Sequence, residues 1–340
     1  MIEETVFNKK TIISVIKKQY GIKINNIKKL ERGSANLYSL NNDKYILKEF
    51  QSKYSQKEVN KEIKIINHLK KDNLLVPKYI ITNNGKYSFI YKKKTIVLQE
   101  FIEGYTMESN TGNYDQMLES ARELGKIVKS LKTLKMKLPI NNASSWYKID
   151  ALNESIEKHK KLLGKCNDEN RKKIDKDLKE KVSMLEYIKN NFDFSELKNL
   201  TLMNTHGDYS VLQFIYKDDK IKAIIDFVSA CKMPIVWEII RSYSYIDKSA
   251  KDGKININNL VDYVKEFLKY SKLNKYDIKY MPYLYLVQLL SSTFGYKQYI
   301  ADISKENLLK FAFFRTRLCK YLFKNAGVIE KSLEKEIIYK

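Results

Sequence analysis

One segment, from Leu202 to Tyr243, constrains the fold and function of this chain more than any other, because candidate catalytic side chains are densest there. An apolar approach leads into His206-Gly207-Asp208, a sequence that does not readily continue a strand. Two extended runs follow, separated by a polar turn, and the second, Ile221–Phe227, is rich in β-branched and apolar residues. The segment therefore predicts a loop followed by a β-hairpin.

This hairpin would bring three polar side chains together. If its turn is centred on Asp218-Asp219, strand pairing places Asp226 opposite Val211, close to Asp208 and Gln213. Mg²⁺ prefers oxygen ligands and keeps waters and phosphate oxygens in its shell, so Gln213 and Asp226 suffice as protein ligands. Asp208 then remains available to orient a hydroxyl group and to accept its proton. The arrangement suits phosphoryl transfer from a nucleotide.

The spacing of these groups resembles a known family. Asp208, an amide side chain five positions later and Ile225-Asp226-Phe227 are similar to the catalytic and metal loops of the kinase fold. His206-Gly207-Asp208 resembles the aminoglycoside phosphotransferase and choline kinase branch, which phosphorylates small molecules. That family usually has Asn where this chain has Gln213, whose longer side chain still presents a carbonyl oxygen. We expect His206 to hydrogen-bond the backbone and hold the loop, with no part in proton transfer.

The resemblance implies a bilobal, protein-kinase-like α+β fold. Residues 1–102 would form an amino-terminal lobe with an antiparallel sheet and one helix, and residues 103–340 a larger, mainly helical carboxy-terminal lobe. A chain of 340 residues is long enough for two such lobes with a cleft between them. The implied reaction moves the γ-phosphate of ATP or GTP to a hydroxyl group of a small molecule, with Mg²⁺ as cofactor.

A lysine and a glutamate in the amino-terminal part fit the same fold. Tyr45–Phe50 alternates so that Lys48 shares a face with apolar neighbours, where a positive charge needs an anion. The resemblance assigns Lys48 to the nucleotide phosphates, while a surface lysine lying along apolar side chains is the alternative. A capping box at Ser55–Glu58 begins a helix, and Glu62 lies on the buried edge of its apolar stripe. We therefore expect Glu62 to pair with Lys48.

Two further parts of the nucleotide site follow from the resemblance alone. The loop at residues 31–36, which contains Ser34, would cover the nucleotide phosphates with backbone N–H groups, although a plain hairpin connection is an alternative. A strand from Thr95 to Phe101 leads to a hinge between the lobes. Backbone groups near Glu100 and Ile102 would meet the nucleotide base.

The carboxy-terminal part is predicted to be mainly helical. Tyr114–Leu134 has the period of a core helix, and Asp150–Asn191 predicts a helical hairpin that either shapes the acceptor pocket or is a solvated pair. Trp237–Tyr243 resembles the family's helix that supports the metal loop, with Glu238 where Asp is common. Residues 257–339 are helical and aromatic, which indicates core packing with some residues available to an acceptor.

The net charge opens two alternatives to an active kinase. A formal charge of +23 would attract polyanions. The lysines are scattered, however, and no RNA-binding motif or long basic block accompanies them, which argues against nucleic acid. A basic polyanion- or RNA-binding protein stays open because of the charge. A catalytically silent kinase-like protein that binds nucleotide or a partner stays open because of Gln213.

Cysteine usage and hydropathy predict a cytoplasmic protein outside the membrane. Cys166, Cys231 and Cys319 lie far apart, which is typical of a reducing compartment and not of a disulfide framework or zinc site. The residues Met1–Lys10 are mixed and charged, which argues against a secretory signal. The longest uncharged run, Met281–Tyr296, is shorter than the about 20 residues that span a bilayer.

The sequence does not specify the acceptor. Aminoglycosides are polycations, for which a strongly basic chain is an awkward host unless a local acidic pocket overrules the average. Choline-like, amino-alcohol, sugar and nucleoside-like acceptors are all compatible with the chain. No pattern in the sequence indicates an oligomeric state.

Overall fold

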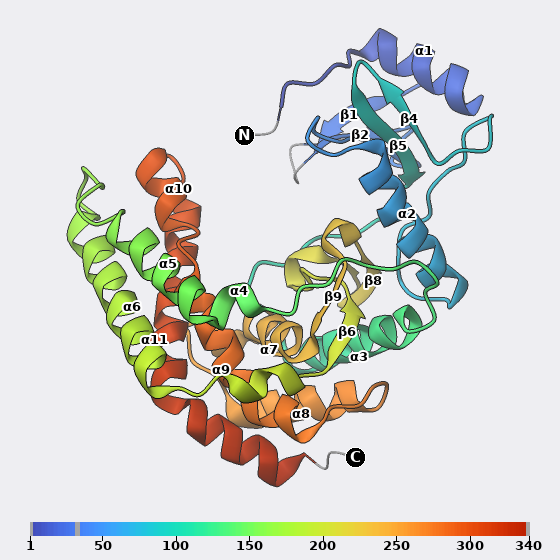
Figure 1. The fold of residues 1–340 in the computed structure, drawn as a ribbon. Helices are drawn as coiled ribbons and strands as arrows, with labels where there is room; N and C mark the ends of the chain where they lie inside the picture. Colours follow the sequence, from blue (N-terminus) through green and yellow to red (C-terminus); the bar gives the residue numbers. More distant parts are fainter. Residues whose placement is uncertain (1–2, 31–34, 338–340) are drawn as a thin grey trace. The chain divides into compact units, whose positions relative to one another are not determined.

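The computed structural model describes residues 3–30 and 35–337, which group into two compact units (Figure 1). Unit 1 comprises Met1–Met107, Ser130–Lys137 and Gln213–Ala230; unit 2 comprises Glu108–Lys129, Leu138–Leu212 and Cys231–Lys340. The sequence analysis set one boundary at residues 102 and 103. The contacts instead group residues 213–230, which include the predicted hairpin, with the amino-terminal sheet.

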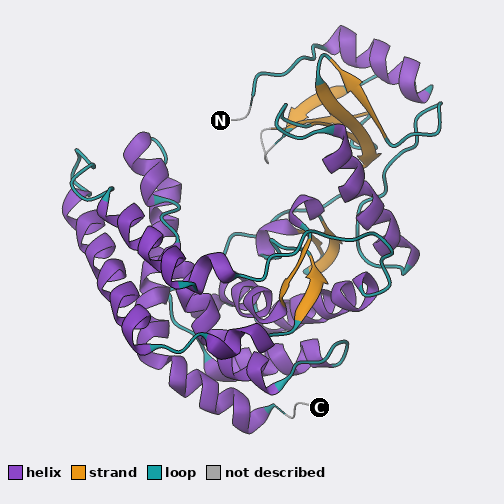
Figure 2. Ribbon diagram, in the orientation of Figure 1, coloured by secondary structure: helices purple, strands orange, loops and turns teal. Residues whose placement is uncertain are grey.

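Unit 1 is built on a five-stranded antiparallel sheet in the order β1-β2-β3-β5-β4 (Figure 2). In the turn between β2 and β3, Asn41, Asn42 and Asp43 all have positive φ. Asn and Asp reach this left-handed region at low cost, which explains the choice of residues. The strands are β1 Ile27–Leu30, β2 Asn36–Leu40, β3 Tyr45–Glu49, β4 Ser88–Tyr91 and β5 Lys94–Glu100.

Two helices accompany this sheet, where the sequence analysis expected one. The expected helix is α2, Gln56–Lys71, which begins at the predicted capping box. The additional helix is α1, Lys9–Tyr20, whose buried Ile12, Ile16 and Tyr20 pack in the same apolar core as the sheet. Its signals were present in the sequence as a capping box at Asn8 and apolar residues spaced four apart.

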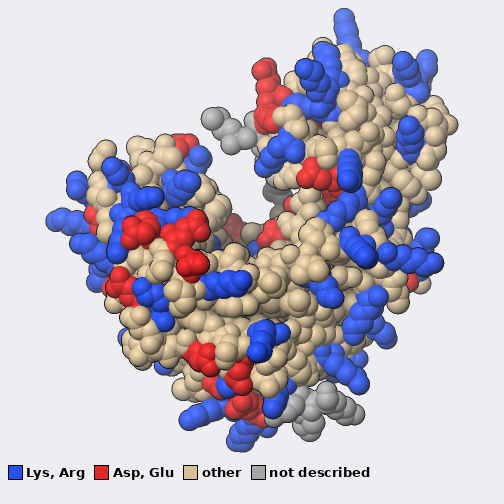
Figure 3. All heavy atoms as spheres, in the orientation of Figure 1, with Lys and Arg blue, Asp and Glu red and all other residues tan. Residues whose placement is uncertain are grey.

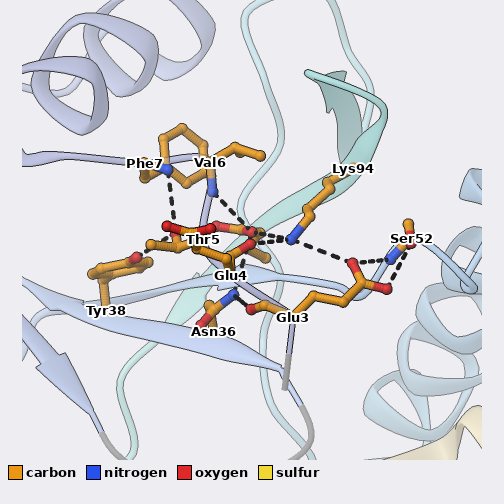
Figure 4. A network of polar contacts seen from close by, with 10 residues as sticks. Glu3, Glu4, Thr5, Val6, Phe7, Asn36, Tyr38, Ser52 and Lys94 are labelled. Atoms are coloured by element: carbon orange, nitrogen blue, oxygen red, sulfur yellow. Dashed lines mark hydrogen bonds and ion pairs between the residues drawn. The ribbon is translucent and has the colours of Figure 1, made fainter. Parts of the chain in front are cut away.

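A buried polar network ties the amino-terminal segment to the sheet (Figure 4). Glu49 at the end of β3 is fully buried and lies 2.9 Å from the ammonium group of Lys94 on β5. Thr5 donates to one Glu49 oxygen at 2.6 Å, and Asn36 donates to the other at 3.3 Å. Asn36 also donates to the backbone oxygen of Glu3, so this network anchors the segment preceding α1.

Unit 2 is mainly helical. Helices α5 and α6 form the predicted helical hairpin, and α11 packs along α9 (Figure 1). Its helices are α3 Tyr114–Leu131, α4 Ser144–Tyr147, α5 Ile149–Lys160, α6 Arg171–Asn191, α7 Ile235–Ile246, α8 Ile257–Leu268, α9 Lys275–Ser291, α10 Tyr296–Ala301 and α11 Glu306–Glu336.

Short elements complete the chain. Two strands, β6 Leu202–Thr205 and β9 Cys231–Pro234, pair antiparallel in unit 2. The 3-10 helices are η1 Ser195–Asn199, η2 Val211–Gln213, η3 Phe227–Ser229 and η4 Lys248–Ala250. The predicted α+β class, with a small antiparallel amino-terminal sheet and a helical carboxy-terminal part, is confirmed. Across residues 3–30 and 35–337, no helix combines the length and apolar character needed to cross a bilayer.

We expect Glu49→Ala to lower the free energy of unfolding by about 3–5 kcal/mol, because it leaves the buried Lys94 ammonium without its main counter-charge. Urea denaturation followed by circular dichroism measures the change. Glu103→Ala is the control, since it removes an exposed ion pair with Lys217 in the same unit and should have no measurable effect. Equal effects of the two substitutions would contradict the role given to Glu49.

Candidate active site

The predicted hairpin is present in unit 1. Strands β7, Phe214–Lys217, and β8, Lys220–Ile224, pair antiparallel around the two-residue turn Asp218-Asp219. Both turn residues have positive φ, 52° and 55°. This is the backbone of a type I′ turn, whose twist matches that of paired strands and which Asp tolerates.

The register of this hairpin corrects the predicted one. The ladder shifts by one residue, so that Lys222 in β8 has no partner across the hairpin. The N–H group of Ile225 consequently donates to the Gln213 carbonyl at 2.9 Å. The prediction that Asp226 lies opposite Val211 is therefore wrong by one position. With this shift Ile225 faces Gln213, and Asp226 is the next residue. Asp226 is therefore closer to Gln213 than it would be in a hairpin without the bulge.

Asp226 has an unusual backbone that its neighbours hold in place. Its φ and ψ are 68° and 56°, the left-handed region, and it leads directly into η3. Helix α2 packs against η3, and Lys61 on α2 donates to the Ala230 carbonyl at 3.2 Å. Asp tolerates this conformation better than most residues, and the contacts of η3 with α2 fix the segment that follows it.

Helix α2 also carries the residue expected to meet Lys48. The Lys48 ammonium lies 4.0 Å from a Glu62 oxygen and 4.4 Å from the centre of the Phe50 ring. Glu62 is only 1% exposed, and Lys48 is held in the centre of the sheet between Leu37 on β2 and Val97 on β5. The sequence thus located two residues, 14 positions apart in number, that the structure brings within ion-pairing distance.

A buried tyrosine connects Glu62 with Asp226. Burial raises the pKa of Tyr79 well above its ordinary value, and the negative charges of Glu62 and Asp226 raise it further. Both carboxylates therefore lie within electrostatic range of one buried hydroxyl. Tyr79 also forms an isolated bridge with Gln99 on β5. The sequence analysis did not select Tyr79, since an isolated tyrosine carries no motif.

The segment after β5 is where the sequence expected the nucleotide base. The Glu100 N–H donates to the Lys78 carbonyl at 2.9 Å. The half-buried Ile102 makes no backbone hydrogen bond within the described part of the chain. Just beyond it, a side chain on Gly104 would place its Cβ 2.2 Å from the Tyr216 carbonyl, so only glycine fits there. Ser34, the predicted phosphate-loop residue, lies outside the described residues.

In unit 2, strand β6 ends at the loop that presents Asp208. We call Thr205–Tyr209 the Asp208 loop. His206 is fully buried, and its Nδ1 accepts a hydrogen bond from the Asp208 N–H at 3.3 Å. The expected structural role of His206 is thereby confirmed. Gly207 has φ 81°, a conformation that favours glycine.

Glu238 on α7 holds both ends of the Asp208 loop. It is fully buried, accepts the Tyr209 N–H at 2.8 Å and accepts the Thr205 hydroxyl. The sequence analysis assigned the helix of Glu238 to support of the metal loop. The contacts instead connect it with the Asp208 loop, because α7 follows β9, which pairs with β6.

Arg241, one turn further along α7, was not found from the sequence. Its guanidinium donates to a carboxylate oxygen of Asp208 at 2.5 Å and to the Tyr209 carbonyl at 2.9 Å. It also lies over the rings of Trp237 and Tyr245, at 5.2 Å and 5.0 Å. The Asp208 side chain nevertheless remains 42% exposed. Its signal in the sequence was a single arginine in a mainly apolar helix, three positions after Glu238.

The predicted site residues divide between the units in a definite way. Asp208 belongs to unit 2, and four residues separate it from Gln213 along the chain. The predicted nucleotide and metal residues that the structure describes all belong to unit 1: Lys48, Glu62, Glu100, Ile102, Gln213 and Asp226. Unit 1 therefore contains the predicted nucleotide and metal residues that the structure describes, and unit 2 contains the candidate base.

The model of the phosphotransferase enzyme family matches residues 26–258, which is more than half of the chain. The chain therefore belongs to this family. The kinase-like fold and the resemblance to aminoglycoside phosphotransferases and choline kinase, both expected from the sequence, are confirmed.

The chain is also similar to individual proteins, at low sequence identity. Homoserine kinase from Zymomonas mobilis subsp. mobilis is 27% identical over 201 residues, 59% of this chain and 57% of that protein. The chain thus spans less than two thirds of that relative. Spectinomycin phosphotransferase with ADP and spectinomycin has a TM-score of 0.64 at 14% identity, covering 96% of this chain and 100% of that one. Choline kinase from Cryptosporidium parvum Iowa II has a TM-score of 0.58 at 14% identity, covering 96% and 99%.

Glu238→Ala should lower the free energy of unfolding by about 2–4 kcal/mol, because it leaves two buried donors of the Asp208 loop without an acceptor. Thermal and urea unfolding measure this change. Glu157→Ala, which alters an exposed position on α5, is the control and should leave unfolding unchanged. If Glu238→Ala behaves like the control, Glu238 does not hold the loop.

Proposed function

We propose that this protein transfers the γ-phosphoryl group of ATP or GTP to a hydroxyl group of a small molecule. The observation that carries the proposal is the position of α2. This one helix supplies Glu62 to Lys48 and packs against η3, directly after Asp226. The family match across residues 26–258 supports the same class of reaction.

The nucleotide would bind to unit 1. The Lys48 ammonium contacts the nucleotide phosphates, and Glu62 fixes the direction of that side chain from its buried position. Backbone groups around Glu100 and Ile102 receive the base. The ADP in the solved spectinomycin phosphotransferase supports a nucleotide as phosphate donor.

Gln213 and Asp226 fit a hard divalent cation. Both residues lie at the open end of the β7–β8 hairpin. The Ile225 N–H donates to the Gln213 carbonyl there, and Asp226 is the residue after Ile225. Their amide and carboxylate oxygens are donors that Mg²⁺ accepts, and the shell of Mg²⁺ commonly includes only one or two protein ligands. Bound there, Mg²⁺ would neutralise charge on the phosphate oxygens.

Asp208 is proposed as the catalytic base. Its carboxylate orients the acceptor hydroxyl and receives its proton as the hydroxyl oxygen bonds to the γ-phosphorus. The bond between that phosphorus and the bridging oxygen breaks, and ADP or GDP leaves. Arg241 holds the carboxylate through one oxygen, while Glu238 and His206 hold the backbone that carries it.

The acceptor class and cellular setting complete the proposal. The names of the relatives specify spectinomycin, homoserine and choline, which supports a small-molecule acceptor. Cys166, Cys231 and Cys319 form no disulfide within residues 3–30 and 35–337, which supports a cytoplasmic setting. On the face shown in Figure 3, Lys and Arg side chains are spread over both units and form no single basic patch. This distribution does not favour the polyanion-binding alternative.

Asp208→Asn should fold normally and bind nucleotide, yet lose about 10²–10⁴-fold in turnover, because an amide does not accept the hydroxyl proton. ADP release across a library of hydroxyl metabolites and antibiotics first identifies the acceptor of the natural protein. The variant is then measured with that acceptor, and unchanged turnover would remove Asp208 from the mechanism. Magnesium-dependent nucleotide binding without any acceptor would favour the catalytically silent alternative.

Asp226→Asn should abolish the magnesium dependence of nucleotide binding, while Asn keeps the left-handed backbone of the native residue. Calorimetric titration with ATP, with and without a chelator, measures this. Metal removal should weaken ATP binding to the natural protein by about tenfold or more and leave the variant unaffected. Gln213→Asn, which restores the residue usual in the family, is the matched variant and should keep the dependence. A chelator effect retained in Asp226→Asn would exclude Asp226 as a ligand.

A further inference from the structure

Unit 2 buries two cations that the proposed mechanism does not use. Lys181 on α6 is 2% exposed, and Arg315 on α11 is 8% exposed. Both side chains meet at Ser292, which follows α9. The Lys181 ammonium donates to the Ser292 carbonyl at 2.7 Å, and Arg315 donates to the Ser292 hydroxyl at 3.1 Å. Three separate helices thus bring two positive charges to one residue.

One buried carboxylate, Asp177, acts on this pair, since its negative charge raises the pKa of Lys181. Neither cation forms an ion pair within 4.0 Å of an acidic side chain in residues 3–30 and 35–337. Asp177 instead accepts hydrogen bonds from the Tyr296 hydroxyl at 2.8 Å and from the Lys320 ammonium at 3.1 Å. The buried Nε of Arg315 has no hydrogen-bond partner within the same described residues.

Burying positive charge in excess of the nearby negative charge is unfavourable, and the pKa of Lys181 is lowered accordingly. Burial lowers the pKa of Lys181 to about 8, because the ammonium group has lost its water. The guanidinium of Arg315 adds to the same positive cluster. A buried cation without a counter-charge is destabilising unless an anion joins it. The cluster therefore holds two buried cations near one carboxylate that is shared with Lys320, and an added anionic group would balance its excess positive charge.

A continuous set of contacts joins this cluster to Asp208 within unit 2. Arg241, which binds the Asp208 carboxylate, lies 5.0 Å from the Tyr245 ring. Tyr245 lies 5.6 Å from Phe311, and the Arg315 guanidinium lies 5.7 Å from the same Phe311 ring. The candidate base and the buried cations are thus the two ends of one arginine-lined aromatic array.

We propose that this array, Arg241-Tyr245-Phe311-Arg315-Lys181, receives the acceptor and that the acceptor carries an anionic group bound by Arg315 and Lys181. The inference rests on the proposed function and specifies its substrate class. The acceptor is a small hydroxyl compound bearing a carboxylate or a phosphate, with its hydroxyl at Asp208. The aromatic rings contact its carbon skeleton, and the charged ends of the array repel polycations such as aminoglycosides.

The shape of the side chains adds to this assignment. Arg315 offers a planar fork suited to a carboxylate or phosphate, and Lys181 adds a point charge beside it. Phe311 is only partly buried, and the exposed Phe294 lies 6.1 Å from it. The aromatic part of the array is therefore open to a ligand, while the cationic end is screened from water.

The test is direct binding to the full-length protein, which does not depend on turnover. The probes are glycerate, glycerophosphate and neutral glycerol, measured by calorimetric titration and by thermal shift. We expect one or both anions to bind and glycerol not to bind. Arg315→Lys, which keeps the charge and loses the fork, and Lys181→Met should each weaken anion binding by about tenfold or more. Circular dichroism verifies that both variants fold.

Lys320→Met is the matched control, because Lys320 lies in the same helical layer but is partly exposed and already paired with Asp177 and Glu180. It should leave anion binding unchanged. Equal binding of glycerol and the anions, or equal loss in the control and in Arg315→Lys, overturns the inference. Anion binding that depends on Arg315, with phosphorylation of neutral or cationic hydroxyl compounds only, overturns the anionic-acceptor assignment and leaves the proposed kinase reaction standing. Anion binding without phosphorylation of any hydroxyl compound contradicts the proposed kinase reaction. Preference among the anions distinguishes carboxylate from phosphate.

Discussion

The residues proposed to bind nucleotide and metal in unit 1 depend on the helix that carries the buried carboxylate of Glu62. A carboxylate that is 1% exposed is tolerated only where positive charge compensates it, and Lys48 provides that charge from the centre of the sheet. The same helix is fixed at η3, where Lys61 binds the Ala230 carbonyl. Displacing α2 would therefore disturb Lys48 and Asp226 together. One helix therefore positions both the proposed phosphate-binding lysine and the proposed metal ligand of this unit.

In unit 2, buried side chains hold the Asp208 loop while its carboxylate stays accessible. Glu238 and Arg241 are three positions apart and share a face of α7. The first accepts donors from the backbone and side chains of the Asp208 loop, and the second donates to a carbonyl and to Asp208 itself. The carboxylate on this helix face thus binds hydrogen-bond donors of the loop, and the guanidinium binds hydrogen-bond acceptors of the same loop. Buried groups hold the backbone of the loop, while the Asp208 side chain remains 42% exposed.

Local periodicity located some residues correctly, and tertiary packing decided the others. Lys48 followed from strand alternation and Glu62 from a helical stripe, and these two local patterns place the side chains 4.0 Å apart. The register of Asp226 was wrong by one because a bulge at Lys222 is a property of the paired strands, which no single strand encodes. Arg241 was missed because an isolated arginine in an apolar helix has no meaning until its partner is known. Helix α1 could have been predicted from the sequence, because a capping box and apolar residues spaced four apart mark it.

The high net charge of the chain does not by itself select an anionic acceptor. At physiological ionic strength the Debye length is about 8 Å, so solvent-exposed lysines spread over the surface attract anions weakly and without orientation. A buried cation is screened far less, since little water or salt reaches it. Lys181 and Arg315 are buried in unit 2 and donate to Ser292, whereas the buried Lys94 of unit 1 is paired with Glu49. Selectivity for an anionic acceptor would therefore arise from these two residues, while the remaining surface charge raises only the frequency of encounter.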